Sequence, residues 1–129
     1  MSIYTEQDAK AILDKVIKLS KADECTAQLG GSIDGNVRFA RNAVSTSGIV
    51  SDANLVVQVA FGKRVGTATI NEFDDASLEK VVRRAEDLAK LAPENPEFMP
   101  AIDKQTYKPS ATFSESTAAI TPDFRAKVA

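Results

Sequence analysis

Residues 54–91 read NLVVQVAFGKRVGTATINEFDDASLEKVVRRAEDLAKL. Apolar side chains alternate with others from Leu55 to Phe61, which indicates a strand with one buried face. Gly62-Lys63 suits a two-residue type II′ turn, because glycine accepts a positive φ at the first central position. Residues 65–70 are rich in Val and Thr and predict the return strand. This segment therefore begins with a β-hairpin.

The second half of the same segment predicts an amphipathic helix. Its apolar residues recur at steps of three and four, which places them on one face. They are Leu78, Val81, Val82, Ala85, Leu88 and Ala89. Asp74 is a suitable N-cap. We expect this face to pack on the strand residues Leu55, Val57, Val59 and Phe61.

Residues 65–98 also carry a family resemblance. The pattern comprises a glycine-flanked strand, the turn GTATIN at residues 66–71, an acidic helix cap, and a helix rich in Ala, Arg and Leu that ends at Ala92-Pro93. Residues 37–42, VRFARN, add a second similar segment. In this order and spacing, the chain resembles the N-terminal domain of the TldD/PmbA proteins over about residues 8–125.

The resemblance implies a peptide-processing parent protein. TldD/PmbA proteins are called modulators of DNA gyrase and are regarded as metallopeptidases that work as homodimers or heterodimers. In the TldD branch, zinc is held by a His-Glu-x-x-x-His motif in the C-terminal half. This chain contains no histidine, which excludes a Ser-His-Asp triad, a Cys-His pair and a His-ligated zinc site. The expectation is a module without catalytic or metal-binding residues, with zinc only in a C-terminal domain outside it.

The composition limits the classes of partner and the cellular location that we expect for this chain. The 129 residues fit one domain with a real core. The net charge of −2, with both signs interspersed, lacks the electrostatic footprint of a nucleic-acid-binding protein. No apolar run is long enough for a membrane helix, and the N-terminus lacks the features of a signal peptide. The single cysteine, Cys25, excludes an internal disulfide and fits a reducing cytoplasm.

The rest of the N-terminal region predicts one more helix and two more strands. Thr5 caps a helix over residues 6–20, and Asp8 occupies the acidic position of a capping box. Alternation predicts strands at 25–33 and 37–44, joined by a type I′ hairpin at Asp34-Gly35. A polar loop is expected at 45–53. The order is α-β-β-β-β-α, an α+β two-layer sandwich with a mostly antiparallel four-stranded sheet and two helices on one face.

The chain changes character after residue 92. Four prolines, Pro93, Pro96, Pro100 and Pro109, favour an extended Pro/Ser/Thr linker over residues 93–117. Residues 118–129 then begin a further helix with Thr121 as its cap and Pro122 at its first position. Because this helix stops after about two turns, we expect a truncated chain. We also expect the tail to pack on another copy and form a dimer; the alternative is that it folds back along its own sheet edge.

Four polar residues are candidates for contact with a peptide or partner subunit. Arg38, Arg41 and Asn42 belong to the family-like strand, and Asn71 ends the family-like turn. For the other candidate residues, a role in holding the fold together explains their place in the sequence better than a role in binding or catalysis. Cys25 could be a nucleophile, but it has no histidine base and fits a core strand. Glu72, Asp74 and Asp75 could hold a cation, but they fit a helix cap. The basic residues of the second helix, paired with Glu79 and Glu86 at i to i+4, fit a solvated face.

Two functions remain open at the level of the sequence. The resemblance implies a non-catalytic N-terminal module of a TldD/PmbA-type metallopeptidase, which contributes to dimerisation and to the path of a peptide through strand addition. The alternative is a freestanding protein- or peptide-binding adaptor domain without peptidase activity.

Overall fold

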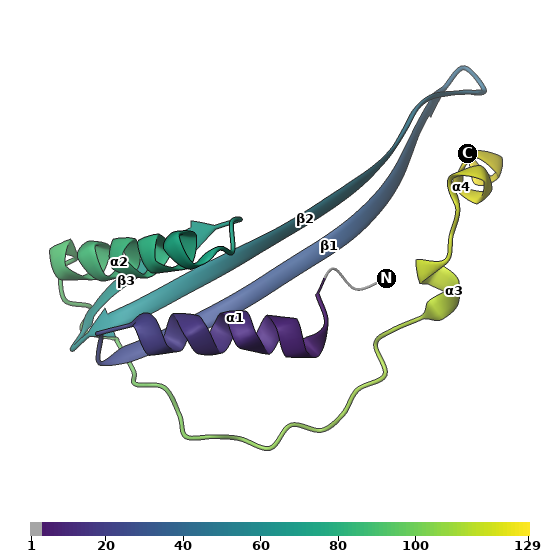
Figure 1. The fold of residues 1–129 in the computed structure, drawn as a ribbon. Coiled ribbons are helices and arrows are strands. Elements are labelled where there is room, and N and C mark those ends of the chain that lie inside the picture. Colours follow the sequence, from purple (N-terminus) through teal and green to yellow (C-terminus); the bar gives the residue numbers. More distant parts are fainter. Residues whose placement is uncertain (1–3) are drawn as a thin grey trace. The chain divides into compact units, whose positions relative to one another are not determined.

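The computed structural model describes residues 4–129 (Figure 1). Its elements are α1 (Glu6–Leu19), β1 (Glu24–Ala40), β2 (Ala43–Phe61), β3 (Arg64–Ile70), α2 (Asp75–Leu91), α3 (Glu115–Ala118) and α4 (Pro122–Val128). Among residues 4–129, none of the helices has the length and apolar content that crossing a bilayer requires. The expected N-caps are confirmed: Thr5, Asp74 and Thr121 each accept a backbone N–H of the helix that follows.

The sheet has three antiparallel strands in the order β1-β2-β3. Leu55 pairs with Ile70 and Phe61 with Arg64, so the β2–β3 hairpin turns at Gly62-Lys63 as predicted. Gly62 has a φ of 58°, which the type II′ turn requires at this position. The α+β class and the antiparallel pairing are confirmed.

The prediction of four strands was wrong, because the first turn lies elsewhere. β1 runs without a break through Asp34-Gly35, and the chain reverses at Arg41-Asn42. Both turn residues have positive φ, 53° and 58°, as a two-residue type I′ hairpin requires. The expected loop at residues 45–53 is part of the 19-residue strand β2. Residues 25–33 and 37–40 of the two predicted strands therefore belong to one strand, β1, and the predicted loop at 45–53 belongs to the neighbouring strand β2.

One hydrophobic core holds the two long helices on one face of the sheet. Leu55, Val57 and Val59 of β2 are at most 1% exposed, and they cluster with Val16 of α1 and with Leu78, Val81, Val82, Ala85 and Ala89 of α2. Cys25, Ala27 and Leu29 of β1 pack on the edge of this cluster. The predicted strand and helix faces meet as expected, with one exception at Leu88.

Leu88 was predicted in the buried stripe but is 44% exposed, while Ala89 is fully buried. The reason lies in Gly66 of β3. A Cβ added to Gly66 would lie 2.2 Å from the Ala85 carbonyl oxygen and 2.3 Å from the Ala89 nitrogen. Because α2 approaches the β3 backbone this closely, the contact admits small residues and turns the Leu88 side chain outward.

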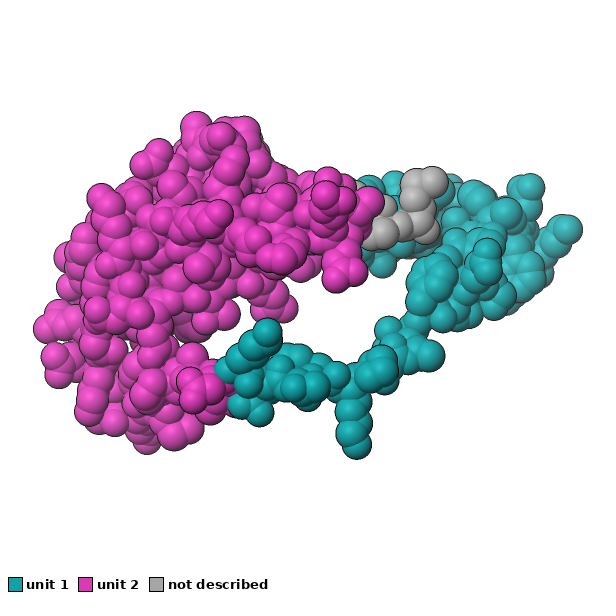
Figure 2. All heavy atoms as spheres, turned by 60° about the horizontal axis from the view of Figure 1, so that its bottom comes forward, with its two compact units in different colours: residues 1, 32–51, 104–129 teal, residues 2–31, 52–103 magenta. Residues whose placement is uncertain are grey.

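The chain divides into two compact units (Figure 2). Unit 2 comprises the described residues up to Gly31 and residues 52–103, and it contains the core. Unit 1 comprises residues 32–51, named here the hairpin end, and residues 104–129 with α3 and α4. Residues 95–101 are held on the rest of unit 2 by hydrogen bonds. The Asn95 N–H donates to the Lys63 carbonyl at 2.9 Å, and the Ala101 N–H donates to the Glu24 carboxylate at 3.2 Å. The domain boundaries at residues 92 and 117 stay a prediction.

Candidate functional site: an apolar groove in unit 1

Unit 1 has no buried side chain among residues 32–51 and 104–129. Its large apolar residues are instead exposed, for example Phe39 at 56% and Ile49 at 62%. Val44, Val50, Tyr107 and Phe113 are exposed in the same way. Apolar side chains gathered on a surface mark places where proteins bind other molecules. The exposed apolar surface of unit 1 is therefore the candidate site.

The apolar side chains of unit 1 line a cavity of about 830 Å³. One wall is β1, whose alternate residues Ile33, Gly35, Val37 and Phe39 share one face, as the strand period dictates. Ile49 of β2 adds to it, and the opposite wall is formed by Ile120, Phe124 and Val128 at four-residue spacing. We call this cavity the apolar groove. It suits apolar side chains of a ligand, because its walls offer them surface removed from water.

Arg125 of α4 is the charged residue of the groove. A Cβ added to Gly35 would lie 2.5 Å from the Arg125 Cζ, so the guanidinium lies against bare strand backbone. Nη1 of Arg125 donates to the Ile120 carbonyl at 3.0 Å. Its Nε is buried and has no acceptor among residues 4–129. Gly35 therefore provides the space that lets α4 bring a cation to the strand.

The predicted contact residues lie at separate places. Arg38 is an exposed residue of β1, and its carbonyl accepts the Ser45 hydroxyl at 3.1 Å. Arg41 and Asn42 are exposed and form the turn, so their backbone conformation serves the hairpin. Asn71 follows β3 in unit 2 and is exposed. The structure thus groups the first three on the hairpin end, and their contact with a peptide or partner stays a prediction.

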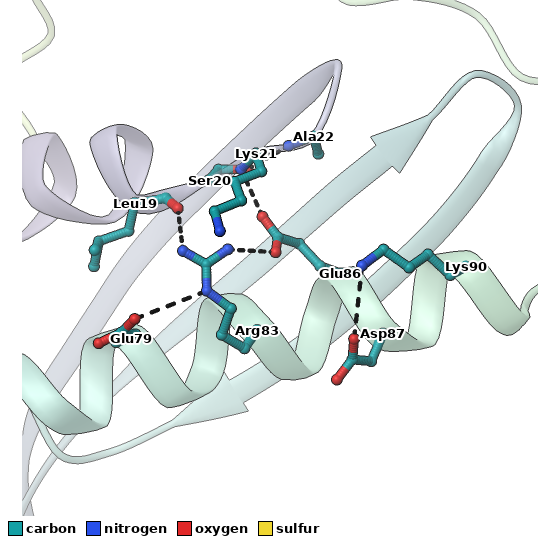
Figure 3. Close-up of polar contacts among 9 residues, drawn as sticks. All are labelled: Leu19, Ser20, Lys21, Ala22, Glu79, Arg83, Glu86, Asp87 and Lys90. Carbon is teal, nitrogen blue, oxygen red and sulfur yellow. Dashed lines mark hydrogen bonds and ion pairs between the residues drawn. The ribbon is translucent and has the colours of Figure 1, made fainter.

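A second charged cluster lies in unit 2, around the buried Glu86 (Figure 3). Glu86 is 2% exposed, so the prediction of a solvated Glu86–Lys90 pair was wrong. Its carboxylate accepts the Lys21 N–H at 2.6 Å and the Arg83 guanidinium at 2.5 Å. Arg83 also donates to the Leu19 carbonyl at 2.7 Å, while Lys90 lies 3.8 Å from Asp87. The predicted Glu79–Arg83 pair is present at 3.9 Å.

The contacts of the Glu86 cluster serve to hold the fold together and not to carry out a reaction. Burial acts to raise the pKa of Glu86, but the Lys21 N–H and the Arg83 guanidinium outweigh it and hold the pKa below its usual range. The carboxylate is thus ionised at neutral pH and is occupied by donors from the end of α1 and from α2. The carboxylate therefore links these two helices through hydrogen bonds, and Lys15 and Asp75 form a further ion pair between them.

The remaining candidates do not form a reactive site. Burial raises the pKa of the Cys25 thiol more than its hydrogen bond to Ser20 lowers it, and the Glu86 charge raises it further, so the thiol stays protonated. Asp74 caps α2 through the N–H groups of Ala76 and Ser77. Within residues 4–129, no three His, Cys, Asp or Glu side chains are grouped as metal ligands, so the residues present do not fit the zinc of the family.

Sequence reasoning missed Ile33, Ile49 and Arg125 as site residues. A signal was present for the first. The odd-numbered positions 25, 27, 29, 33, 37 and 39 are all apolar, and this period continues through Asp34-Gly35 without a change of face. Arg125 had no signal, because its place depends on a contact between residues 90 positions apart in the chain.

Comparison with known proteins agrees with this fold. Residues 30–89 match the family described as PmbA/TldA metallopeptidase domain 1. TldE from Thermococcus kodakarensis has a similar structure, with a TM-score of 0.75 and 17% identity over 89% of this chain and 26% of its own. So does a candidate modulator of DNA gyrase from Bacteroides thetaiotaomicron, with a TM-score of 0.74 and 17% identity over 92% of this chain and 28% of its own.

The two solved structures show the fold alone at this identity, and the chain spans about a quarter of their length. A search of the curated proteins finds no match. The sequence match covers the turn at Arg41-Asn42, all of β2 and β3, and α2 as far as Ala89. Residues 30–89 of this chain, a little less than half of its length, therefore match domain 1 of the PmbA/TldD family.

Proposed function

We propose that this chain is the non-catalytic N-terminal module of a PmbA/TldD-type metallopeptidase and that it provides a contact for dimerisation and for the peptide. The observation that carries the proposal is the hairpin end. Its strands pair fully, yet Ile33, Phe39, Val44, Ile49 and Val50 are each more than 40% exposed. Surface of this kind gains free energy when another molecule covers it.

The proposed contact is tested by the state of association. We expect the chain to be a dimer in light scattering and the double change Val44→Ser with Val50→Ser to give a monomer. Neither residue lines the apolar groove. Leu91→Ser is the matched control, because Leu91 is 84% exposed but lies in unit 2. A wild-type monomer, or a double variant that still dimerises, would contradict the proposed contact.

The proposed lack of catalysis is tested on the same protein. Zinc sites and hydrolytic triads need ligands and bases that the sequence lacks, since it has no histidine. We expect no stoichiometric zinc after dialysis against a weak chelator and no cleavage of casein above a blank. Zinc at one equivalent, or cleavage that follows the purified chain, would contradict this part of the proposal.

A further inference from the structure

We propose that the apolar groove binds an acidic peptide segment that carries apolar side chains. The inference rests on the proposed function, in which a peptide passes this module, and it adds the chemical class of that peptide. It is carried by the lining of the groove and by the charges of unit 1.

The groove has the dimensions and the lining of a binding site. Its volume of about 830 Å³ lies within the range of small-ligand sites, roughly 300–1,000 Å³. Apolar residues come from both walls, including Val37 and Phe39 of β1 and Phe124 of α4. Phe39 and Phe124 are still 56% and 54% exposed, so the two walls do not fill the space between them. A ligand with apolar side chains would remove this surface from water.

The charges give the ligand its sign. Among the residues that line the groove, Arg125 alone has an ionised side chain. Unit 1 as a whole has six basic side chains, Arg38, Arg41, Lys104, Lys108, Arg125 and Lys127, against three acidic ones, Asp34, Glu115 and Asp123. Unit 2 has the opposite balance, with ten basic and fifteen acidic side chains. Arg125 in the groove, together with the excess of basic side chains in the same unit, attracts an acidic segment and repels a basic one.

The same charges decide between possible occupants. The hairpin end of a second copy is apolar, but it carries two basic side chains, Arg38 and Arg41, against one acidic side chain, Asp34, so its charge does not match the groove. Nucleic acid has the right charge, but its phosphates would not remove the apolar walls from water. An acidic peptide with Leu or Phe side chains matches both the lining and the charge.

The test compares three labelled peptides by fluorescence anisotropy. They share the same Leu and Phe positions and differ only in the residues between them, which are Glu, Gln or Lys. We expect the Glu peptide to bind about tenfold more tightly than the Lys peptide, with an affinity that falls as salt is added. Equal binding of the three peptides would overturn the inference and leave the proposed dimer contact untouched, because that contact is measured without peptide.

Variants locate the binding. Phe39→Ser and, on the neighbouring strand, Ile49→Ser should each weaken the binding of all three peptides. Two variants are used so that the test still stands if one of them does not fold. Arg125→Gln should weaken the Glu peptide while leaving the Gln peptide unchanged. Arg84→Gln is the matched control. It also removes one positive charge, but Arg84 is an exposed residue of unit 2. If Arg84→Gln lowers the affinity as much as Arg125→Gln, or if neither Ser variant has an effect, the groove is not the site.

Discussion

At the scale of the residue, Glu86 shows how a charge becomes part of the core. A buried carboxylate is costly unless donors surround it. Here the donors are the Lys21 N–H, where the chain leaves α1, and the guanidinium of Arg83 on the same helix. Arg83 in turn reaches the Leu19 carbonyl near the end of α1. A residue expected to be solvated therefore joins the two helices.

We expect Arg83→Ala to lower the free energy of unfolding by about 2–3 kcal/mol, because it leaves the buried Glu86 carboxylate with one donor fewer. Urea unfolding measures this change. Arg84→Ala is the control: Arg84 is exposed, and the change should stay within about 0.5 kcal/mol. Equal effects of the two changes would mean that the Arg83–Glu86 pair adds no stability.

The pKa of Glu86 makes a second prediction, on pH. Because this pKa is lower in the folded chain than its usual value of 4.5, the carboxylate stabilises the fold above that value. The contribution is lost as the pH falls through the folded pKa. Urea unfolding at neutral pH and at about pH 3 should therefore show a larger loss for the wild type than for Glu86→Gln.

The other lowered pKa does not disturb this comparison. Hydrogen bonds from Ser77 hold the pKa of Asp74 below its usual range, but Asp74 is present in both proteins. The difference between the wild type and Glu86→Gln therefore reports on Glu86. Parallel losses in the two proteins would show that Glu86 does not contribute.

At the scale of the element, the contact between α2 and β3 depends on the absence of a side chain at Gly66. Gly66→Ala would place a methyl group 2.2 Å from a carbonyl oxygen of α2, and backbone cannot move aside as a flexible side chain can. We expect a loss of about 3 kcal/mol or more in thermal or urea unfolding. In Gly48→Ala the new Cβ would lie 3.5 Å from Asn36 Oδ1, an ordinary contact, so the change should stay within about 0.5 kcal/mol.

The elements also show what the sequence could and could not predict. The β2–β3 hairpin, the face of α2 and the helix caps follow from local periodicity and cap chemistry. Asp34-Gly35 is a strong local turn signal, but the unbroken alternation around it agrees with a continuous strand that β2 pairs along its length. The burial of Glu86 was out of reach, because its partner Lys21 lies 65 residues away in the sequence.

At the scale of the whole molecule, the prediction concerns residues 101–129. Tyr107, Phe113 and Val128 are 85%, 75% and 73% exposed, so this segment retains apolar surface in the single chain. Arg125 of this segment lies against Gly35 of its own chain. We expect the apolar surface that stays exposed to join Val44 and Val50 in the contact with a second copy, so that the dimer needs both. In light scattering, a chain that ends at Pro100 should be a monomer while the full chain is a dimer. If both are compact monomers, the segment belongs to its own copy alone.

The two long strands have a consequence for the opening of the native state. β2 is one continuous strand, yet Val57 is fully buried while Thr46 and Ser47 have no buried neighbour on their own strand within the hairpin end. Backbone hydrogen bonds without a packed side chain above them open at little cost. Amide hydrogens near Arg41-Asn42 should therefore exchange with deuterium long before those around Val57. The part of β2 near Arg41-Asn42 would thus open transiently, while the part around Val57 stays closed. While that end is open, its backbone N–H and C=O groups can pair with an added strand.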